Sequence, residues 1–255
     1  MSESLPKLIS EEEALERAET LRKTFSILYK IGFKKVLDQV PVEMTIPTED
    51  FLEADKLVAT IKAFLYEKYR VPAICLQLPN KKIYMIDGHH RLLVHRLFKE
   101  NTMNSYILLP EGEIEYYKPL KNIMDLSIIK MPLSRSNLPF LNTVKIVLYY
   151  RRIYGDVFYL ERRNVDVLSL VPTQTLISTE GLEYWSDKYS PITCLEYLDK
   201  LYILDGHTRA FSKAIKGEYS AEALIIKSSV KISFKIVETA KKLGLSNIMD
   251  VKIIE

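Results

Sequence analysis

The sequence has 255 residues and a formal net charge of +3, and 27% of its residues are charged. This length allows one large domain or two small ones, and the small net charge excludes the strong basic excess of a protein dedicated to coating DNA. Two cysteines are too few for a disulfide scaffold, the start of the chain has no signal-peptide pattern, and no apolar run is long enough to cross a bilayer. We therefore expect a cytoplasmic protein without membrane contacts.

The first half of the chain alternates between helical and extended patterns. Ser10 and Glu13 form a capping-box pair at the start of the first helix, and Gly32 is expected to interrupt that helix. In chain order the expected elements are a helix (10–38), an extended edge (40–48), a helix (49–68), two strands that form a hairpin-like pair (73–78 and 83–86), a helix (90–100) and a strand (105–109).

The most informative segment is Asp87-Gly88-His89-His90-Arg91, between the expected strand and the expected helix. A strand that ends in glycine and opens a helix leaves the first helical N–H groups pointing forward, where they favour an anion. The histidines and Arg91 add hydrogen-bond donors. Asp87 could bind a metal ion, orient a histidine or accept a proton. The combination predicts a nucleotide with Mg²⁺.

The middle of the chain, residues 113–163, is less regular. A helix is expected over 138–152. Residues 149–152 and 162–163 combine aromatic and basic side chains. Such a mixture can bind nucleic acid, although it is more often the end of an amphipathic helix.

The second half repeats the order of motifs found in the first. The matched segments are 165–174 with 40–49, 190–195 with 71–76, 205–209 with 87–91, and 223–226 with 106–109. Four features in the same order predict a duplicated α/β unit. Cys75 and Cys194 fall in the middle of matched strands, so we expect both to be buried. A final helix is expected over 230–243.

The two copies differ in chemistry. Glu49, in Pro-Thr-Glu, is replaced in the second copy by Gln174, in Pro-Thr-Gln, and His90 is replaced by Thr208. Only the first copy therefore keeps a carboxylate and a second histidine, which predicts one active centre and one structural or ligand-holding partner. The secondary site consists of Asp205, Gly206, His207, Thr208 and Arg209.

The strand, the D-G-H-H-R turn and the helix resemble the ParB/sulfiredoxin superfamily. The closer resemblance is to archaeal free-serine kinases built on a ParB-like domain, which carry D-G-H-H-R and an upstream P-x-E, matched here by residues 87–91 and 47–49. The resemblance covers residues 38–110, and the repeat in the second half departs from those kinases. Abundant Lys, Glu and Ile with only three Gln lean toward a thermophile.

The resemblance implies an α/β (α+β) fold of duplicated ParB/sulfiredoxin-like units, with small mixed sheets flanked by helices. The expected parts are an N-terminal helical segment (1–39), a first unit with DGHHR (40–112), a connecting segment (113–163), and a second unit with DGHTR and a C-terminal helix (164–255).

The same resemblance implies a nucleotide-dependent small-molecule phosphotransferase, with ATP or ADP as donor and free L-serine as the leading acceptor. Glu49 would be the catalytic base, and Asp87 would bind Mg²⁺ or position the hydroxyl group. The phosphates would be held by Gly88, His89, His90 and Arg91. Two alternatives stay open: a ParB-like DNA-binding protein or nuclease, and a non-catalytic nucleotide-binding scaffold.

Overall fold

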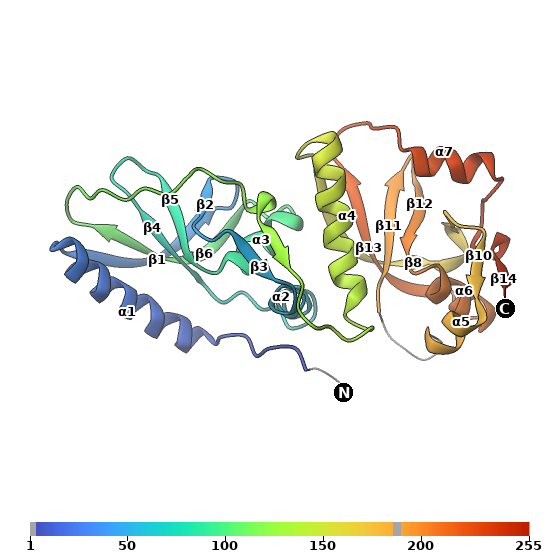
Figure 1. The fold of residues 1–255 in the computed structure, drawn as a ribbon, viewed down its shortest axis with the longest axis horizontal. Helices are drawn as coiled ribbons and strands as arrows, with labels where there is room; N and C mark the ends of the chain where they lie inside the picture. Colours follow the sequence, from blue (N-terminus) through green and yellow to red (C-terminus); the bar gives the residue numbers. More distant parts are fainter. Residues whose placement is uncertain (1–3, 186–189, 255) are drawn as a thin grey trace. The chain divides into compact units, whose positions relative to one another are not determined.

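The computed structural model describes residues 4–185 and 190–254. Residues 1–3, 186–189 and 255, which fall in the first and last expected parts, lie outside this description. The chain divides into two compact units, Met1–Leu133 (unit 1) and Ser134–Glu255 (unit 2), shown in Figure 1. The boundary falls inside the expected connecting segment 113–163. Within the described ranges, no helix is both long and apolar enough to cross a membrane.

Unit 1 is built on a five-stranded mixed sheet with the order β1-β6-β4-β5-β2. Helix α1 contacts the sheet at β1, β4 and β6, and α2 packs against α3. A two-stranded parallel sheet pairs β3 with β7. The elements are α1 (Glu11–Tyr29), β1 (Phe33–Pro41), β2 (Thr45–Pro47), β3 (Phe51–Glu53), α2 (Ala54–Tyr66), β4 (Ala73–Gln77), β5 (Ile83–Asp87), α3 (His89–Leu97), β6 (Thr102–Pro110), the 3₁₀ turn η1 (Ile123–Asp125) and β7 (Ser127–Ile129).

Unit 2 has a five-stranded sheet with the order β8-β13-β11-β12-β9 and a two-stranded parallel sheet, β10-β14. Helices α4 and α6 both contact the large sheet. The elements are α4 (Leu138–Tyr154), β8 (Phe158–Asp166), η2 (Val167–Ser169), β9 (Leu170–Val171), β10 (Leu176–Ser178), α5 (Thr179–Trp185), β11 (Ile192–Tyr197), β12 (Lys200–Asp205), α6 (His207–Ile215), β13 (Ser220–Ser228), α7 (Lys235–Lys242), η3 (Ile248–Asp250) and β14 (Lys252–Ile254).

The two sheets have the same topology, which confirms the duplicated fold. In each sheet the central strand, β4 or β11, pairs antiparallel with the next strand in sequence and parallel with the long strand that follows the helix. A bulge interrupts each antiparallel pair at the same place, before Cys75 in unit 1 and before Cys194 in unit 2. Both cysteines are fully buried, as predicted, because the central strands are covered on both faces.

Several element boundaries differ from the predictions. The capping box of Ser10 and Glu13 is present, but α1 ends at Tyr29, and the expected helical residues 33–38 belong to strand β1. This strand is at the edge of its sheet and mostly exposed, so charged residues replace the alternation of apolar and polar residues that predicts a strand. The expected helix at 49 begins only at Ala54, because the residues before it pair as β3.

Candidate functional site

The two Asp-Gly-His-x-Arg segments form the same strand–turn–helix, as predicted. Asp87 ends β5 and His89 begins α3, and β12 and α6 meet in the same way. The glycines between them have positive φ, 114° at Gly88 and 101° at Gly206. A Cβ atom at Gly88 would lie 2.8 Å from the Cβ of Ala73, so both the backbone and the available space require glycine. The first N–H groups of each helix therefore have no partner within the helix.

A cleft of about 350 Å³ opens at the first turn, within unit 1. The six residues expected for the first site all line it: Glu49, Asp87, Gly88, His89, His90 and Arg91. Further lining residues, which the motifs did not identify, include Lys7, Arg17, Glu53, Lys56 and Tyr69. Lys7 lies in the N-terminal segment, Arg17 on α1, Glu53 at the end of β3, Lys56 on α2 and Tyr69 in the loop after α2. Tertiary packing brings them to the turn, so no local sequence pattern identifies them.

His89 orients Glu49. The ring of His89 is buried, and its Nε2 accepts a hydrogen bond from the main-chain N–H of Thr48 at 3.0 Å. The ring proton is therefore on Nδ1, which lies 3.3 Å from Oε1 of Glu49. The hydrogen bond from His89 holds the pKa of Glu49 below its ordinary value, and burial only partly opposes this shift. Glu49 is thus an oriented, ionised carboxylate with 52% of its side chain exposed.

His90 occupies a similar position on the other side of the turn. Its Nε2 accepts from the main-chain N–H of Glu53 at 3.1 Å, and the Glu53 carboxylate contacts Lys56 at 2.9 Å. Burial lowers the pKa of His90, and the nearby carboxylates of Glu53 and Glu49 only partly oppose it. The ring is therefore neutral at physiological pH and carries its proton on Nδ1. That N–H is a donor at the edge of the cleft.

Arg91 is directed into the interior of unit 1. Its Nη1 donates to the carbonyl oxygens of Val71 (3.2 Å) and Pro72 (2.8 Å), and its Nη2 lies 3.5 Å from Oδ1 of Asp87. The other carboxylate oxygen of Asp87 lies 3.4 Å from Nη1 of Arg17, whose side chain is 55% exposed. Arg91 therefore ties the turn to the start of β4, and Arg17 is the arginine that faces solvent.

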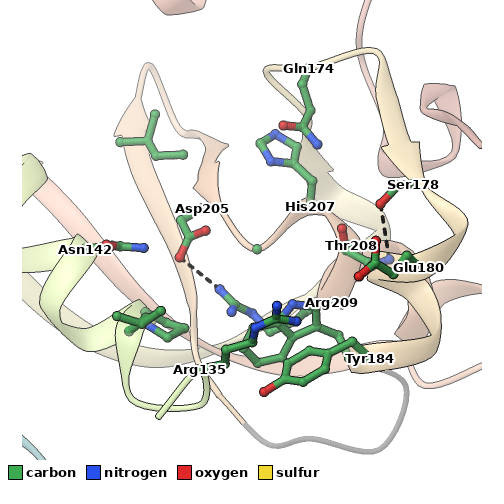
Figure 2. A pocket seen from close by; sticks show the side chains of 16 residues that line it. Arg135, Asn142, Gln174, Ser178, Glu180, Tyr184, Asp205, His207, Thr208 and Arg209 are labelled. Atoms are coloured by element: carbon green, nitrogen blue, oxygen red, sulfur yellow. Dashed lines mark hydrogen bonds and ion pairs between the residues drawn. The ribbon is translucent and has the colours of Figure 1, made fainter. Parts of the chain in front are cut away.

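A second cleft, of about 510 Å³, opens at the second turn, within unit 2 (Figure 2). It is lined by the whole secondary site and by the residue at the position that matches Glu49, namely Asp205, Gly206, His207, Thr208, Arg209 and Gln174. The structure therefore gathers both predicted groups of residues, each in its own unit.

The second turn keeps the hydrogen bond between the threonine and the histidine and the Asp–Arg pair of the first, but it has lost the counterparts of the Glu49 and Glu53 carboxylates. Nε2 of His207 accepts from the main-chain N–H of Thr173 at 2.9 Å, as His89 does from its threonine. The side chain of Gln174 donates instead to the carbonyl oxygen of Leu176 at 3.0 Å. Burial lowers the pKa of His207 to about 4. Ser178 ends β10 where a glutamate ends β3.

Most of the basic and aromatic side chains of 149–163 have partners within unit 2. Residues 162–163 belong to strand β8 and are not the expected helix end. Tyr150 packs its ring with those of Tyr154, Phe158 and Phe234. Three arginines in or near this segment each face a carboxylate: Arg151 with Asp156, Arg162 with Glu222, and Arg163 with Glu196.

No protein-family model matches the sequence, and no curated protein matches it. Among solved structures, protein Atu1540 from Agrobacterium tumefaciens is similar over 37% of this chain and 62% of its own length, with 14% identity and a TM-score of 0.28. Two variants of a free serine kinase, one in complex with ADP and one with AMP, are similar over 86% of this chain and 78% of theirs, with 12% identity and a TM-score of 0.27. At these values, function has to be argued from the site itself.

Proposed function

We propose that this chain is a nucleotide-dependent phosphotransferase, which moves the terminal phosphoryl group of ATP or ADP to the hydroxyl group of a small metabolite. Free L-serine is the leading acceptor. The observation that carries the proposal is the cleft of unit 1, where the oriented carboxylate of Glu49 lies beside the first turn of α3. Phosphoryl transfer needs a proton acceptor for the hydroxyl group and a positive field for the phosphates within one small site.

In the proposed step, Glu49 takes the proton of the acceptor hydroxyl group as the hydroxyl oxygen bonds to the terminal phosphorus atom. The bond from phosphorus to the bridging oxygen breaks, and the nucleotide leaves with that electron pair, one phosphate shorter. Little covalent chemistry is left to the protein in such a transfer, so most of the acceleration comes from alignment and charge neutralisation. The hydrogen bond from His89 supports the alignment of the base.

The phosphates are assigned to the N-terminus of α3. Its free N–H groups and helix dipole favour an anion, and the Nδ1–H of His90 adds a donor. Lys7, Arg17 and Lys56 line the same cleft and supply positive charge. Arg91 stabilises this arrangement, because its hydrogen bonds to the main chain before β4 hold the turn in place. We assign it mainly a positioning role in phosphate binding.

Mg²⁺ enters this proposal only as the partner of the nucleotide. Among the described residues, no group of three His, Cys, Asp or Glu side chains is arranged to hold a metal ion, and Asp87 is already paired with Arg17 and Arg91. This donor set does not fit a resident metal site. It is compatible with the usual protein-bound state of Mg²⁺, in which one carboxylate and substrate phosphates share the ion.

The alternatives receive less support from the site. A DNA-binding protein or nuclease needs an unpaired basic surface, whereas Arg151, Arg162 and Arg163 each face a carboxylate within unit 2. A non-catalytic scaffold does not require an oriented carboxylate at the phosphate turn. A chain that binds nucleotide but transfers no phosphoryl group would be such a scaffold and not a kinase.

The test is a phosphate-transfer screen. The purified chain is incubated with ATP or ADP, Mg²⁺ and a panel of hydroxylated metabolites that includes L-serine, and products are followed by ³¹P NMR. Glu49→Gln should lower turnover by about 10²–10⁴-fold, the usual contribution of a general base, with nucleotide affinity nearly unchanged. Glu12→Gln, at an exposed position of α1 that does not line the cleft, is the matched control.

Two results would refute the proposal. The first is the absence of transfer from either nucleotide to every acceptor, although the nucleotide binds. The second is near-normal turnover in Glu49→Gln. Melting temperatures of both variants separate loss of chemistry from loss of fold.

A further inference from the structure

The cleft of unit 2 has features that the proposed phosphotransfer does not use. Its volume of about 510 Å³ falls within the range of roughly 300–1,000 Å³ found for small-molecule sites. Figure 2 shows Arg135, Arg209 and Tyr184 at one end of this cleft, and Glu180 with Thr208 on the side formed by β10 and α5. Cationic and aromatic groups are thus collected at one end.

Arg209 is the residue at which the two turns differ most in their contacts. In unit 1 the matching Arg91 donates to two main-chain carbonyl groups. Arg209 instead places its guanidinium group 4.7 Å from the ring centre of Trp185, and its Nη2 lies 3.2 Å from Oδ2 of Asp205. The side chain is buried, and its Nε has no hydrogen-bond partner in the described part of the chain. A buried donor of this kind costs free energy unless a ligand supplies an acceptor.

Arg135 brings a second guanidinium group to the same end. It lies 5.0 Å from the ring centre of Tyr184, and the rings of Tyr184 and Trp185 meet edge to face at 5.1 Å. Arg135 is exposed and has no ion pair within residues 4–185 and 190–254. Of these two guanidinium groups, only that of Arg209 pairs with a carboxylate, that of Asp205, and Glu180 lies on the side of the cleft formed by β10 and α5. Positive charge therefore remains at this end.

We propose that the cleft of unit 2 binds a nucleoside phosphate and does not turn it over. The phosphates lie between Arg135, Arg209 and the N-terminus of α6, where charged donors and free N–H groups converge. The base packs on the aromatic surface of Tyr184 and Trp185, as bases do on aromatic side chains in single-strand binding.

Turnover is absent because the groups needed for it are replaced in this copy. Gln174 stands in the place of the base, and an amide cannot take a proton at neutral pH. Thr208 and Ser178 stand where unit 1 has a histidine and a second glutamate. The inference rests on unit 2 alone, so it holds whether or not unit 1 transfers phosphate.

The sequence contains one tryptophan, and it lies in this cleft. Trp185 fluorescence therefore reports on the unit 2 cleft. The full-length chain carrying Glu49→Gln is titrated with ADP, AMP, adenosine and inorganic phosphate, while calorimetry counts binding sites on the same samples. We expect a saturable change with ADP, weaker responses to adenosine and to phosphate, and ADP recovered intact.

Variants identify the groups involved. Arg135→Ala removes an exposed side chain and should weaken ADP binding roughly 10–100-fold, the loss expected for a charged hydrogen bond. Arg209→Lys should have a similar effect because lysine cannot reproduce the planar fork. Arg152→Ala, an exposed arginine of α4 that does not line the cleft, should leave affinity unchanged.

Three outcomes overturn the proposal. The first is a double variant, Arg135→Ala with Arg209→Lys, that binds as many ADP molecules as the parent chain and with the same affinity. Another is equal binding of phosphate and ADP, which would indicate a simple anion site. The third is a fluorescence response to L-serine with none to ADP, which would identify an amino-acid site. Failure of the unit 1 proposal appears separately, as loss of phosphate transfer with the Trp185 response intact.

Discussion

Replacing His89 by alanine tests how the carboxylate of Glu49, the proposed base, is held, and unit 2 supplies a matched control. Both His89 and His207 are buried and accept a hydrogen bond from a main-chain threonine N–H. Only His89 also faces a carboxylate, that of Glu49. His89→Ala and His207→Ala therefore make the same structural change, but only the first removes a contact with the proposed base.

The expected losses of stability are similar. Each variant leaves one partly buried main-chain N–H without an acceptor, which lowers the free energy of unfolding by about 1–3 kcal/mol. Each also leaves a comparable cavity. The contact with Glu49 adds less than about 1 kcal/mol, because half of that side chain is exposed. Urea unfolding should therefore place the two variants within about 1 kcal/mol of each other.

The chemical consequences should differ. In His89→Ala the pKa of Glu49 should rise toward its ordinary value, because the hydrogen bond that lowers it is gone. The acid limb of the rate profile should move to higher pH, and kcat should fall. NMR titration of the Glu49 carboxyl carbon measures this directly. If that carbon titrates identically in wild type and His89→Ala, His89 does not orient the base. His207→Ala should leave the titration unchanged.

Three further predictions concern the turns. Gly88→Ala should destabilise unit 1 by roughly 2–5 kcal/mol in urea unfolding, since it combines left-handed backbone strain with a steric clash. Gly244→Ala has open space around the new methyl group and should destabilise unit 2 by only about 1–2 kcal/mol. The free energy of unfolding of unit 2 should fall by up to about 3 kcal/mol as the pH falls from 6.5 toward 4, because His207 is protonated in the unfolded chain at a higher pH than in the folded unit. A free energy of unfolding that does not change with pH, or a change that persists in His207→Gln, contradicts this. Arg91→Lys should lower the free energy of unfolding of unit 1 by about 1–3 kcal/mol, since an ammonium group cannot reproduce the paired hydrogen bonds to the start of β4. An unchanged melting temperature would contradict the positioning role of Arg91.

The hairpin, the helix after each turn and the duplication were predictable from the sequence because their signals are local. Apolar runs mark β4 and β5, and an Asp-Gly pair marks the turn. The edge strands β1 and β8 were not predictable, because exposed lysines and arginines replace the apolar alternation. The small sheets β3-β7 and β10-β14 join three-residue segments far apart in the chain, so no local pattern specifies them.

The candidate site was only partly predictable for the same reason. Spacing and residue type led to Glu49 and the first turn, and the structure places them in one cleft. The orientation of Arg91 depends on a glycine without a Cβ atom and on two carbonyl groups from another strand. The cations Lys7 and Arg17 reach the cleft through packing of the N-terminal segment and α1. These relations are tertiary and have no signature in the motif.

Comparison of the two copies separates the part of the motif that maintains the fold from the part that carries chemistry. Both turns keep the glycine, the first histidine bonded to a threonine N–H, and the arginine packed against the glycine. The residues that differ are the two glutamates and the second histidine of unit 1, which become Gln174, Ser178 and Thr208, and the arginine makes different contacts in the two units. Asp-Gly-His-x-Arg therefore accounts for the strand–turn–helix that both copies share. The proposed catalysis depends on the variable position x and on the segment 49–53, because His90, Glu49 and Glu53 all line the cleft of unit 1.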